Sequence, residues 1–209
     1  MRTDVLQPRD LIYPDWPAAP RVKAFFTTRT CGVSADPYAS LNLGAHVGDE
    51  PHLVAENRRR VSALLPSVPV WLNQVHGVNV VAAEVARGSN HAATAADGSV
   101  TAEKNVVCAV LVADCLPVLF CMDDGSRVGA AHAGWRGLHR GVLERSIEAL
   151  GSNPAKLLAW LGPAIGANAF EVGADVFDAF TKEAGDDASA FRALIEAYHD
   201  RGYTVRIPE

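Results

Sequence analysis

The densest run of apolar positions extends from residue 106 to residue 137 and predicts the centre of the fold. Residues 106–113 and 117–122 are almost continuously apolar, which is typical of strands that are covered on both faces. The turn-forming sequence Asp-Asp-Gly-Ser at 123–126 separates the second run from a third, at 127–132. The pattern therefore predicts two buried strands, the second of which continues through a hairpin into a return strand.

Shorter patterns on either side predict the remaining elements, after an irregular arm at residues 1–20. We expect loops at 29–48 and 87–101, and a helix that begins at an N-cap, Asp49, and carries apolar positions to about residue 64. The other expected elements are strands at 21–28, 68–74, 78–84 and 157–161, with 68–74 and 78–84 paired, and helices at 137–150, 174–184 and 188–199. Because helices and strands do not alternate strictly, the pattern predicts a single α+β domain over 1–209, with mixed β-sheets flanked by helices.

Composition narrows the classes of partner. The chain has 209 residues, a net charge of −5 and 49% hydrophobic residues, which is ordinary for a soluble globular protein. The negative charge disfavours nucleic acid and anionic membranes as partners, and no protein partner is evident. The N-terminal residues carry charges where an export signal needs an apolar core, so we expect a cytoplasmic protein with reduced cysteines.

Three side chains with metal-binding chemistry lie where apolar runs end. His76, Cys115 and His132 each stand beside a loop, and Gly77, Gly134 and Gly137 allow the backbone to come close. Two imidazoles and one thiolate are a catalytic zinc set, which leaves a fourth position for water. The alternative is a buried, inert cysteine and hydrogen-bonded histidines, and spacing alone leaves both interpretations open.

Five further residues have a functional and a structural interpretation each. Asp114 either orients a ligand or carries a proton, or it is an exposed or capping carboxylate. Arg136 and Arg29 either bind phosphate or carboxylate or form surface salt bridges. Asn42 and Gln74 either bind a purine edge or sugar hydroxyl groups, or form hydrogen bonds within loops.

Five segments together resemble the YfiH family, whose members are described as laccase-domain proteins, polyphenol oxidases or purine nucleoside phosphorylases. The resemblance covers about residues 22–180. The segments occur in the family's order: SLNLGAHVGD (40–49), VWLNQVHG (70–77), ADCLPVLFC (113–121), AAHAGWRG (130–137) and WLGPAIGANAFEVG (160–173). In such proteins the histidine of QVHG, the cysteine of ADC and the histidine of HAGWRG bind zinc, which implies a zinc site at His76, Cys115 and His132.

The resemblance implies an enzyme that acts on purine nucleosides and phosphate. The family is credited with phosphorolysis of adenosine, inosine, guanosine and methylthioadenosine and with adenosine deamination, and zinc is able to activate water for deamination. We expect Cys115, Asp114 and Arg136 to be catalytic, and Arg29, Asn42 and Gln74 to bind substrate. After about residue 185 the sequence departs from the family pattern, as a truncated or diverged C-terminal segment would.

Three alternatives use the same residues differently. Copper is a possible metal, because two histidines and a cysteine also form blue-copper sites with an axial methionine, but seven histidines without a His-x-His pair do not supply a multicopper cluster. A hydrolase would use Cys115 as nucleophile with a nearby histidine as base. Its substrates would be amides or peptidoglycan precursors, and the family fold resembles that of toxin deamidases with a Cys–His pair. The third alternative is a non-catalytic binding protein.

Overall fold

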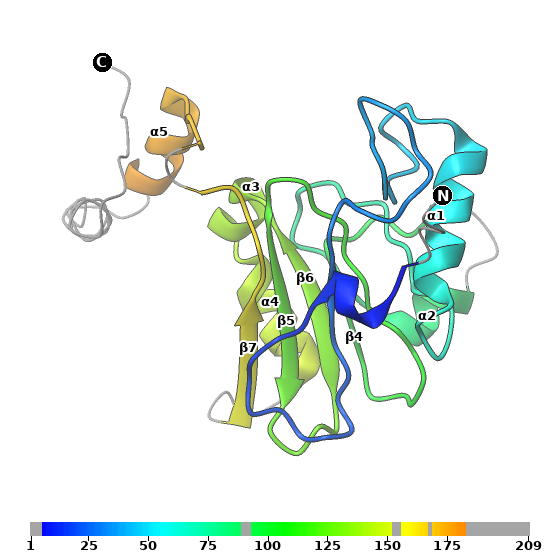
Figure 1. Ribbon diagram of the computed structural model, residues 1–209. Coiled ribbons are helices and arrows are strands. Elements are labelled where there is room, and N and C mark those ends of the chain that lie inside the picture. Colours follow the sequence, from blue (N-terminus) through cyan, green and yellow to red (C-terminus); the bar gives the residue numbers. More distant parts are fainter. Residues whose placement is uncertain (1–5, 89–92, 152–155, 167–168, 183–209) are drawn as a thin grey trace.

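A five-stranded mixed sheet forms the centre of the computed structural model, which describes residues 6–88, 93–151, 156–166 and 169–182 (Figure 1). The strand order is β3-β4-β6-β5-β7, and a separate two-stranded sheet pairs β1 with β2. The strands are β1 Leu11–Ile12, β2 Phe26–Thr27, β3 Val80–Ala82, β4 Gly98–Thr101, β5 Leu116–Met122, β6 Val128–Ala133 and β7 Leu157–Leu161. The helices are η1 Pro8–Asp10, α1 Pro51–Ser62, α2 Ala83–Gly88, α3 Trp135–His139, α4 Val142–Leu150 and α5 Ala174–Lys182. The expected α+β architecture is confirmed.

The hairpin of β5 and β6 brings two of the candidate ligands to one end of the sheet. The strands are antiparallel, with Leu116 opposite Ala133 and Pro117 opposite His132. The predicted turn closes with a 2.8 Å hydrogen bond from the Gly125 nitrogen to the Met122 oxygen, and Gly125 has the positive φ of 66° that such turns favour. Cys115, which directly precedes β5, therefore lies near His132.

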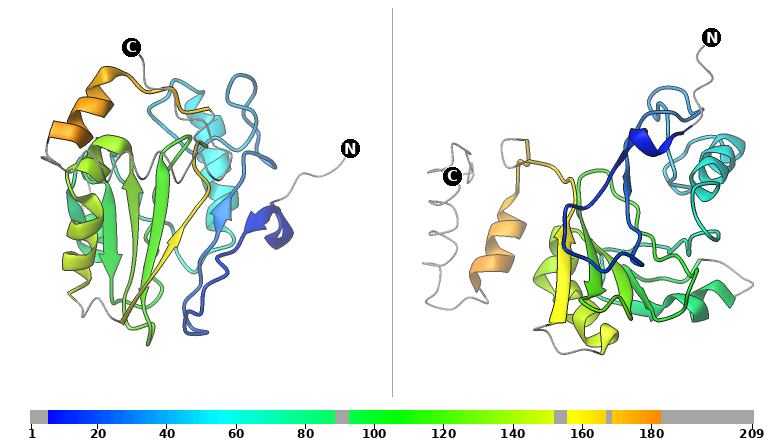
Figure 2. Two further views of the ribbon diagram at one scale, coloured as in Figure 1. Left: turned by 90° about the vertical axis from the view of Figure 1, so that its left-hand side faces the viewer. Right: turned by 60° about the horizontal axis from the view of Figure 1, so that its bottom comes forward.

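Helix α4 covers one face of the sheet, and the N-terminal half of the chain covers the other (Figure 2). The apolar side of α4 packs across β3, β4 and β6. Val142 and Leu150 of this helix are fully buried against the sheet residues Val118, Phe120 and Ala131. This burial anchors the strands that carry the candidate site. Within the described residues, no helix is long and apolar enough to cross a membrane.

Two predicted strands are wrong. Residues 68–74 and 106–113 form only isolated bridges, from Val70 to Cys108 and from Asn73 to Ala95. Val70 and Leu72 are buried, and Val106 and Cys108 are partly buried, in irregular chain that packs against β3 and α2. Apolar packing without strand pairing therefore produced the strand-like pattern. The predicted loop at 87–101 ends in β4, which pairs in parallel with β3, so the predicted pairing of 68–74 with 78–84 is also wrong.

Helix boundaries differ from the predicted ones for local reasons. The predicted helix at 137–150 is broken between α3 and α4 at Gly141, whose φ of 90° is incompatible with a continuous helix. Residues 83–88 form α2, although the pattern placed a strand up to residue 84. The N-cap of α1 is Glu50, not Asp49. The strand β7 confirms the prediction at 157–161, and α5 confirms the predicted helix from residue 174 as far as Lys182. Residues 183–184 and the predicted helix at 188–199 lie outside the described residues.

Candidate metal site

Three candidate ligands from separate segments meet at one end of the sheet. One ligand atom each from His76, Cys115 and His132 lies within 4.8 Å of the other two. His132 belongs to β6 and is 3% exposed, Cys115 is half-buried and His76 is exposed. The group is thus buried on the side of His132 and open to solvent on the side of His76. A site that admits a substrate needs such an opening.

His76 is held in an unusual backbone conformation that turns its ring toward the other two ligands. Its φ is 57°, in the left-handed region. Its Nε2 atom lies 3.8 Å from the Cys115 Sγ atom, and its ring meets the His132 ring edge to face, with 4.7 Å between the centroids. The predicted convergence of these side chains is therefore present.

Gly134 explains how the ligands come so close together. A Cβ atom at this position would lie 2.7 Å from His76 Cδ2 and 3.0 Å from Cys115 Sγ. At Gly137 a Cβ atom would lie 2.8 Å from the Gly77 oxygen. Both glycines allow the close backbone approach that the sequence predicted, because any side chain would push the ligand segments apart.

Asp97, which the sequence analysis did not single out, lies directly beneath two of the ligands. Its carboxylate is fully buried. It accepts backbone hydrogen bonds from Val75, His76 and Gly77, at 3.2, 2.9 and 2.7 Å. Its Oδ1 atom also lies 2.9 Å from His132 Nδ1. In the sequence, Asp97 and Gly98 form an Asp-Gly pair at the end of a polar loop, where β4 begins. This pair was the signal that could have indicated Asp97, but it also fits an ordinary loop.

Burial sets the protonation of the ligands. It lowers the pKa of His132, against the opposing effect of the hydrogen bond to Asp97, and the nearby His76 lowers the pKa further. The His132 imidazole is therefore neutral at pH 7 and has a lone pair for a metal. Burial also raises the pKa of the Cys115 thiol, and the charges of Asp114 and Asp97 raise it further. A bound divalent cation would displace the thiol proton.

The donor chemistry of the group fits a metal ion. Two imidazole nitrogens and one thiolate sulfur suit zinc or copper better than calcium or magnesium, which prefer oxygen ligands. In the described part of the chain, this is the one cluster of three or more His, Cys, Asp or Glu side chains with such geometry. His76, Cys115 and His132 therefore form a group that could bind a metal ion.

Two of the predicted substrate-binding side chains form hydrogen bonds to the backbone. Arg29 donates from Nε and Nη2 to the Ala39 oxygen, at 2.8 and 2.5 Å. Gln74 donates to the Leu111 oxygen and accepts from the Leu111 nitrogen, both at 2.7 Å. These contacts fix the long loop and the segment that leads to His76. The predicted role of both residues in substrate binding stays a prediction.

Asn42 belongs to a polar network between the 29–48 loop and α1. Its amide nitrogen donates to Asp49 Oδ2 at 2.9 Å, and its side-chain oxygen accepts from the Gly44 nitrogen at 2.9 Å. Its backbone oxygen accepts a bond from the buried Asn57. Asn42 therefore forms the hydrogen bonds within the loop that were its structural interpretation. Its predicted contact with substrate stays a prediction.

Asp114 and Arg136 are close in sequence to candidate ligands, because Asp114 precedes Cys115 and Arg136 lies four residues after His132. Asp114 is exposed beside Cys115, and its backbone oxygen accepts a bond from Ile165. Arg136, in α3, lies over the Trp135 ring at 4.4 Å and 3.8 Å from Asp175 of α5. Half of the Arg136 side chain is exposed, at 52%, so it is accessible to an anion. Their predicted catalytic roles stay predictions.

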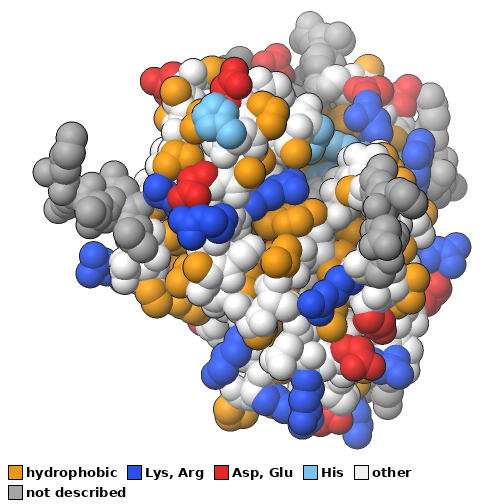
Figure 3. Space-filling view, turned by 90° about the vertical axis from the view of Figure 1, so that its right-hand side faces the viewer, with side chains coloured by type: hydrophobic (Ala, Val, Ile, Leu, Met, Phe, Trp, Pro, Cys, Tyr) orange, Lys and Arg blue, Asp and Glu red, His pale blue; other side chains and the backbone are white. Residues whose placement is uncertain are grey.

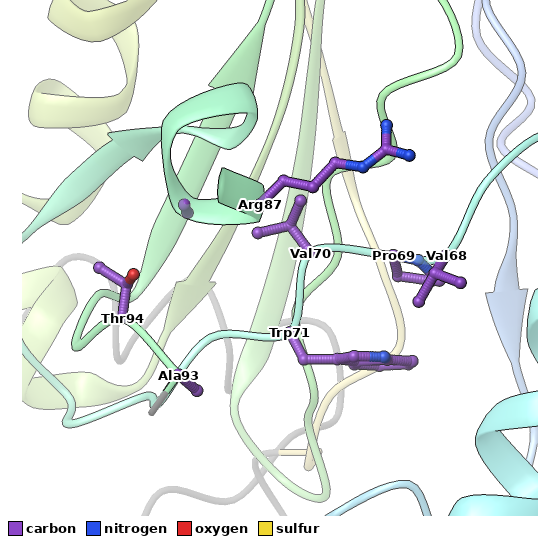
Figure 4. Close-up of a pocket in the computed structure, with 8 residues that line it drawn as sticks. Val68, Pro69, Val70, Trp71, Arg87, Ala93 and Thr94 are labelled. Atoms are coloured by element: carbon purple, nitrogen blue, oxygen red, sulfur yellow. The ribbon is translucent and has the colours of Figure 1, made fainter. Parts of the chain in front are cut away.

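A separate cavity of about 240 Å³ lies near α2 and is lined by residues other than the candidate ligands. Trp71 and Arg87 extend beside Val70 in this cavity (Figure 4), and the Arg58 guanidinium lies 4.4 Å from the centroid of the Trp71 ring. On the face of the molecule shown in Figure 3, apolar and acidic side chains separate the Lys and Arg side chains among the described residues. Among the described residues on that face, the basic side chains do not form one continuous surface of the kind that binds nucleic acid.

Comparison with known proteins identifies the family. The family described as multi-copper polyphenol oxidoreductase laccase matches residues 23–205, and the chain belongs to this family. A curated relative named purine nucleoside phosphorylase, from Pseudomonas aeruginosa, is 54% identical over 178 residues, which are 85% of this chain and 72% of the relative. The purine nucleoside phosphorylase YfiH of Escherichia coli is 53% identical over 188 residues, 89% of this chain and 75% of that protein. The resemblance to the YfiH family is thus confirmed.

Solved structures show the same fold. The crystal structure of protein NMB0706 from Neisseria meningitidis matches with a TM-score of 0.80 and 50% sequence identity, over 87% of this chain and 74% of that one. YlmD from Geobacillus stearothermophilus matches with a TM-score of 0.70 and 33% identity, over 83% of this chain and 69% of that one. The α+β fold of this chain is therefore that of its family.

Proposed function

We propose that this protein is a zinc-containing purine nucleoside phosphorylase that also deaminates adenosine. The supporting observation is the cluster of His76, Cys115 and His132 within 4.8 Å, in a chain 53–54% identical to proteins named purine nucleoside phosphorylase. The proposed substrates are adenosine, inosine, guanosine and methylthioadenosine, together with phosphate.

His76, Cys115 and His132 would hold the zinc ion through two imidazole nitrogens and one thiolate. Zinc bound there would act as a Lewis acid that activates water or polarises a bound purine. His132 Nδ1 faces Asp97, so Nε2 is the nitrogen left for the metal. Asp114, exposed beside Cys115, is placed to exchange protons with solvent during either reaction.

Phosphate needs a cation near the ligands, and Arg136 is better placed than Arg29 to supply it. Arg136 follows Gly134 by two residues, and Gly134 packs against two ligands. Its partner Asp175 is 3.8 Å away and itself mostly exposed, so the ion pair is weak and a phosphate would replace it readily. Arg29, by contrast, already donates two hydrogen bonds to Ala39.

Product analysis tests the proposed reaction directly. In phosphorolysis the bond between the base nitrogen and C1′ breaks and a phosphate oxygen bonds to C1′, so inosine and phosphate give hypoxanthine and ribose 1-phosphate. We expect the zinc-loaded protein to release hypoxanthine only when phosphate is present, and to convert adenosine to inosine without it. Base release at the same rate without phosphate would indicate a hydrolase, and no turnover of any of the four nucleosides would contradict the proposal.

The role of Arg136 is tested against a matched arginine. Arg145 in α4 is also exposed and pairs with Glu148 at 3.1 Å, and α4 packs on β3, β4 and β6. We expect Arg136→Ala to raise the KM for phosphate about tenfold or more, because a charge-assisted contact contributes about 1.5–3 kcal/mol, and Arg145→Ala to leave it unchanged. Equal KM values for the two variants, at full zinc content, would exclude Arg136 from the phosphate site.

The raised pKa of Cys115 disfavours a cysteine hydrolase, and the position of Met122 disfavours a copper oxidase. A cysteine nucleophile works best with a lowered pKa, whereas the pKa of Cys115 is raised. A blue-copper site usually adds an axial methionine. Met122 lies at the far end of β5 from Cys115, about 20 Å away at the usual rise of a strand, and Met1 lies outside the described residues. Zinc phosphorolysis is therefore the function that the site supports best.

A further inference from the structure

One buried carboxylate contacts both histidine segments of the candidate metal site. Asp97 stands just before β4, where its backbone nitrogen donates to the Asn79 oxygen at 2.9 Å and its backbone oxygen accepts from the His132 nitrogen at 2.7 Å. These backbone hydrogen bonds to two different segments fix the position of Asp97. Its side chain is fully buried, so the carboxylate depends on protein donors instead of water.

Toward His132, the carboxylate determines which ring nitrogen carries the proton. His132 Nδ1 lies 2.9 Å from Asp97 Oδ1. A carboxylate only accepts hydrogen bonds, so Nδ1 is the donor and the neutral ring has its lone pair on Nε2. This tautomer presents the free lone pair on the side of the ring away from Asp97, as a metal ligand requires.

Toward His76, the same carboxylate fixes the backbone. Three consecutive nitrogens, of Val75, His76 and Gly77, donate to its two oxygens at 2.7–3.2 Å. His76 is held at a φ of 57°, a left-handed conformation that is uncommon for residues other than glycine and that local hydrogen bonds stabilise. The three bonds supply that stabilisation, so Asp97 orients the His76 side chain without contacting its ring.

We propose that Asp97 is a positioning residue that preorganises the metal site, by selecting the His132 tautomer and by holding the 75–77 segment in place. The inference rests on the metal site of the proposed function but not on nucleoside chemistry. One carboxylate thus connects two ligands that are 56 positions apart in the sequence. Cys115, the third ligand, is positioned separately, by the start of β5.

Asp97→Asn is the informative substitution because asparagine has nearly the same shape as aspartate but replaces one hydrogen-bond acceptor with a donor. The amide NH2 group of asparagine replaces one of the two oxygens, and each oxygen receives two N–H groups in the native protein. With NH2 toward His132, the ring must accept at Nδ1 and carry its proton on Nε2, where it blocks the metal. With NH2 toward Val75 and Gly77, two backbone donors lose their acceptor and the His76 segment is released.

The tautomer is measured by long-range ¹H–¹⁵N NMR of metal-free protein with ¹⁵N-labelled histidine, and His132→Gln identifies the signal of His132. We expect Nδ1–H in the native protein and a shift toward Nε2–H in Asp97→Asn. The native spectrum tests the proposal even if the variant fails to fold. A native ring with its proton on Nε2, or native zinc affinity in a folded Asp97→Asn protein, would overturn the inference.

Zinc affinity, measured by competition with a chromophoric chelator, is the second readout. We expect Asp97→Asn to bind zinc about 10–100-fold more weakly, as other losses of an outer partner of a ligand do. Two controls should retain native affinity. Ser99→Ala changes a buried side chain in the same strand, and Asp49→Asn makes the same chemical change at a carboxylate that accepts from Ser34, Asn42 and Glu50.

The two proposals fail in different ways. Neither the tautomer nor the zinc affinity involves a nucleoside, so a protein without phosphorolysis but with weakened zinc binding in Asp97→Asn would contradict only the proposed function. Native zinc affinity in a folded Asp97→Asn protein would contradict only the positioning role. A loss of affinity in Ser99→Ala equal to that in Asp97→Asn would also overturn it, because general loosening of β4 would then explain both.

Discussion

At Gly134, a single hydrogen in place of a side chain permits the candidate ligands His76 and Cys115 to lie close together. A Cβ atom there would lie 2.7 Å from His76 and 3.0 Å from Cys115. We expect Gly134→Ala to weaken zinc binding about tenfold or more, because the ligand segments must move apart. Competition with a chelator measures this change.

Gly129, in β6, is the matched control for Gly134, which directly follows that strand. A Cβ atom at Gly129 would lie 3.0 Å from a methyl group of Val100 and 3.1 Å from the Ser99 oxygen, so Gly129→Ala also crowds the strand but not the ligands. It should lower the stability of the protein and leave its zinc affinity intact. Native zinc affinity in Gly134→Ala would show that the ligands do not need this close approach.

The Cys115 thiol should react slowly when no metal is bound. Burial and two nearby carboxylates raise its pKa, so its thiolate fraction at pH 7 is below that of an ordinary cysteine and grows only as the pH rises toward the raised pKa. We expect iodoacetamide to alkylate Cys115 more slowly at pH 7 than a cysteine in a short peptide, faster at pH 9, and hardly at all with zinc bound. Peptide mass spectrometry measures each rate.

Cys108 is the internal reference for this experiment. Burial raises its pKa to about 11, so it should react more slowly than Cys115 over the whole pH range. Alkylation of Cys115 at pH 7 as fast as the peptide would mean that its thiolate is stabilised, and the cysteine hydrolase would then regain support.

Among the elements, α1 fixes the long loop through Asn57. This side chain is fully buried. Its oxygen accepts from the Val33 nitrogen at 2.9 Å, and its nitrogen lies within 3.1 Å of oxygens of Ser34, Ser40 and Asn42. Asn57→Ala would leave these buried groups unpaired, so we expect it to lower the free energy of unfolding by about 2–4 kcal/mol in urea titrations.

Arg59 in the same helix is the control for Asn57. It is exposed and pairs with Glu56, so Arg59→Ala should leave the free energy of unfolding almost unchanged, because solvent screens an exposed ion pair. Similar small effects of the two substitutions would show that the loop does not depend on α1.

The elements that the sequence predicted well are those in which local pattern and tertiary structure agree. The hairpin at 117–132 combines continuous apolar strands with a turn sequence, and β7 and α5 have clear limits of their own. Residues 68–74 and 106–113 are just as apolar, but side-chain to backbone bonds such as those of Gln74 to Leu111 replace the strand ladder. No local pattern distinguishes a buried strand from buried irregular chain.

The residues of the candidate site also differ in whether a local sequence pattern predicts them. His76, Cys115 and His132 could be found and grouped because their chemistry is rare and each ends an apolar run, and the family resemblance supported the grouping. Asp97 could not be found, because its role depends on four donors from two distant segments, and its local sequence resembles an ordinary loop. The expected departure from the family pattern after about residue 185 falls outside the described residues and stays a prediction.

For the whole molecule, zinc binding should be coupled to folding. The three ligands come from segments that only the folded chain brings together, so the metal binds the native state preferentially. At a free zinc concentration 100 times the dissociation constant, we expect stabilisation of about 2.7 kcal/mol and a rise in Tm of about 5–10 °C relative to protein in chelator. Calorimetry measures the shift, and His76→Ala should abolish most of it. An equal shift in that variant would place the zinc elsewhere.

The most direct test of the central claim is a zinc titration of the metal-free protein, with hypoxanthine release from inosine and phosphate as the readout. If His76, Cys115 and His132 form the catalytic metal site, activity is absent without zinc, rises in proportion to added zinc and levels off at one equivalent per chain. Cys115→Ala protein stays inactive throughout the titration. Full activity in the metal-free protein, or in Cys115→Ala, would contradict the account.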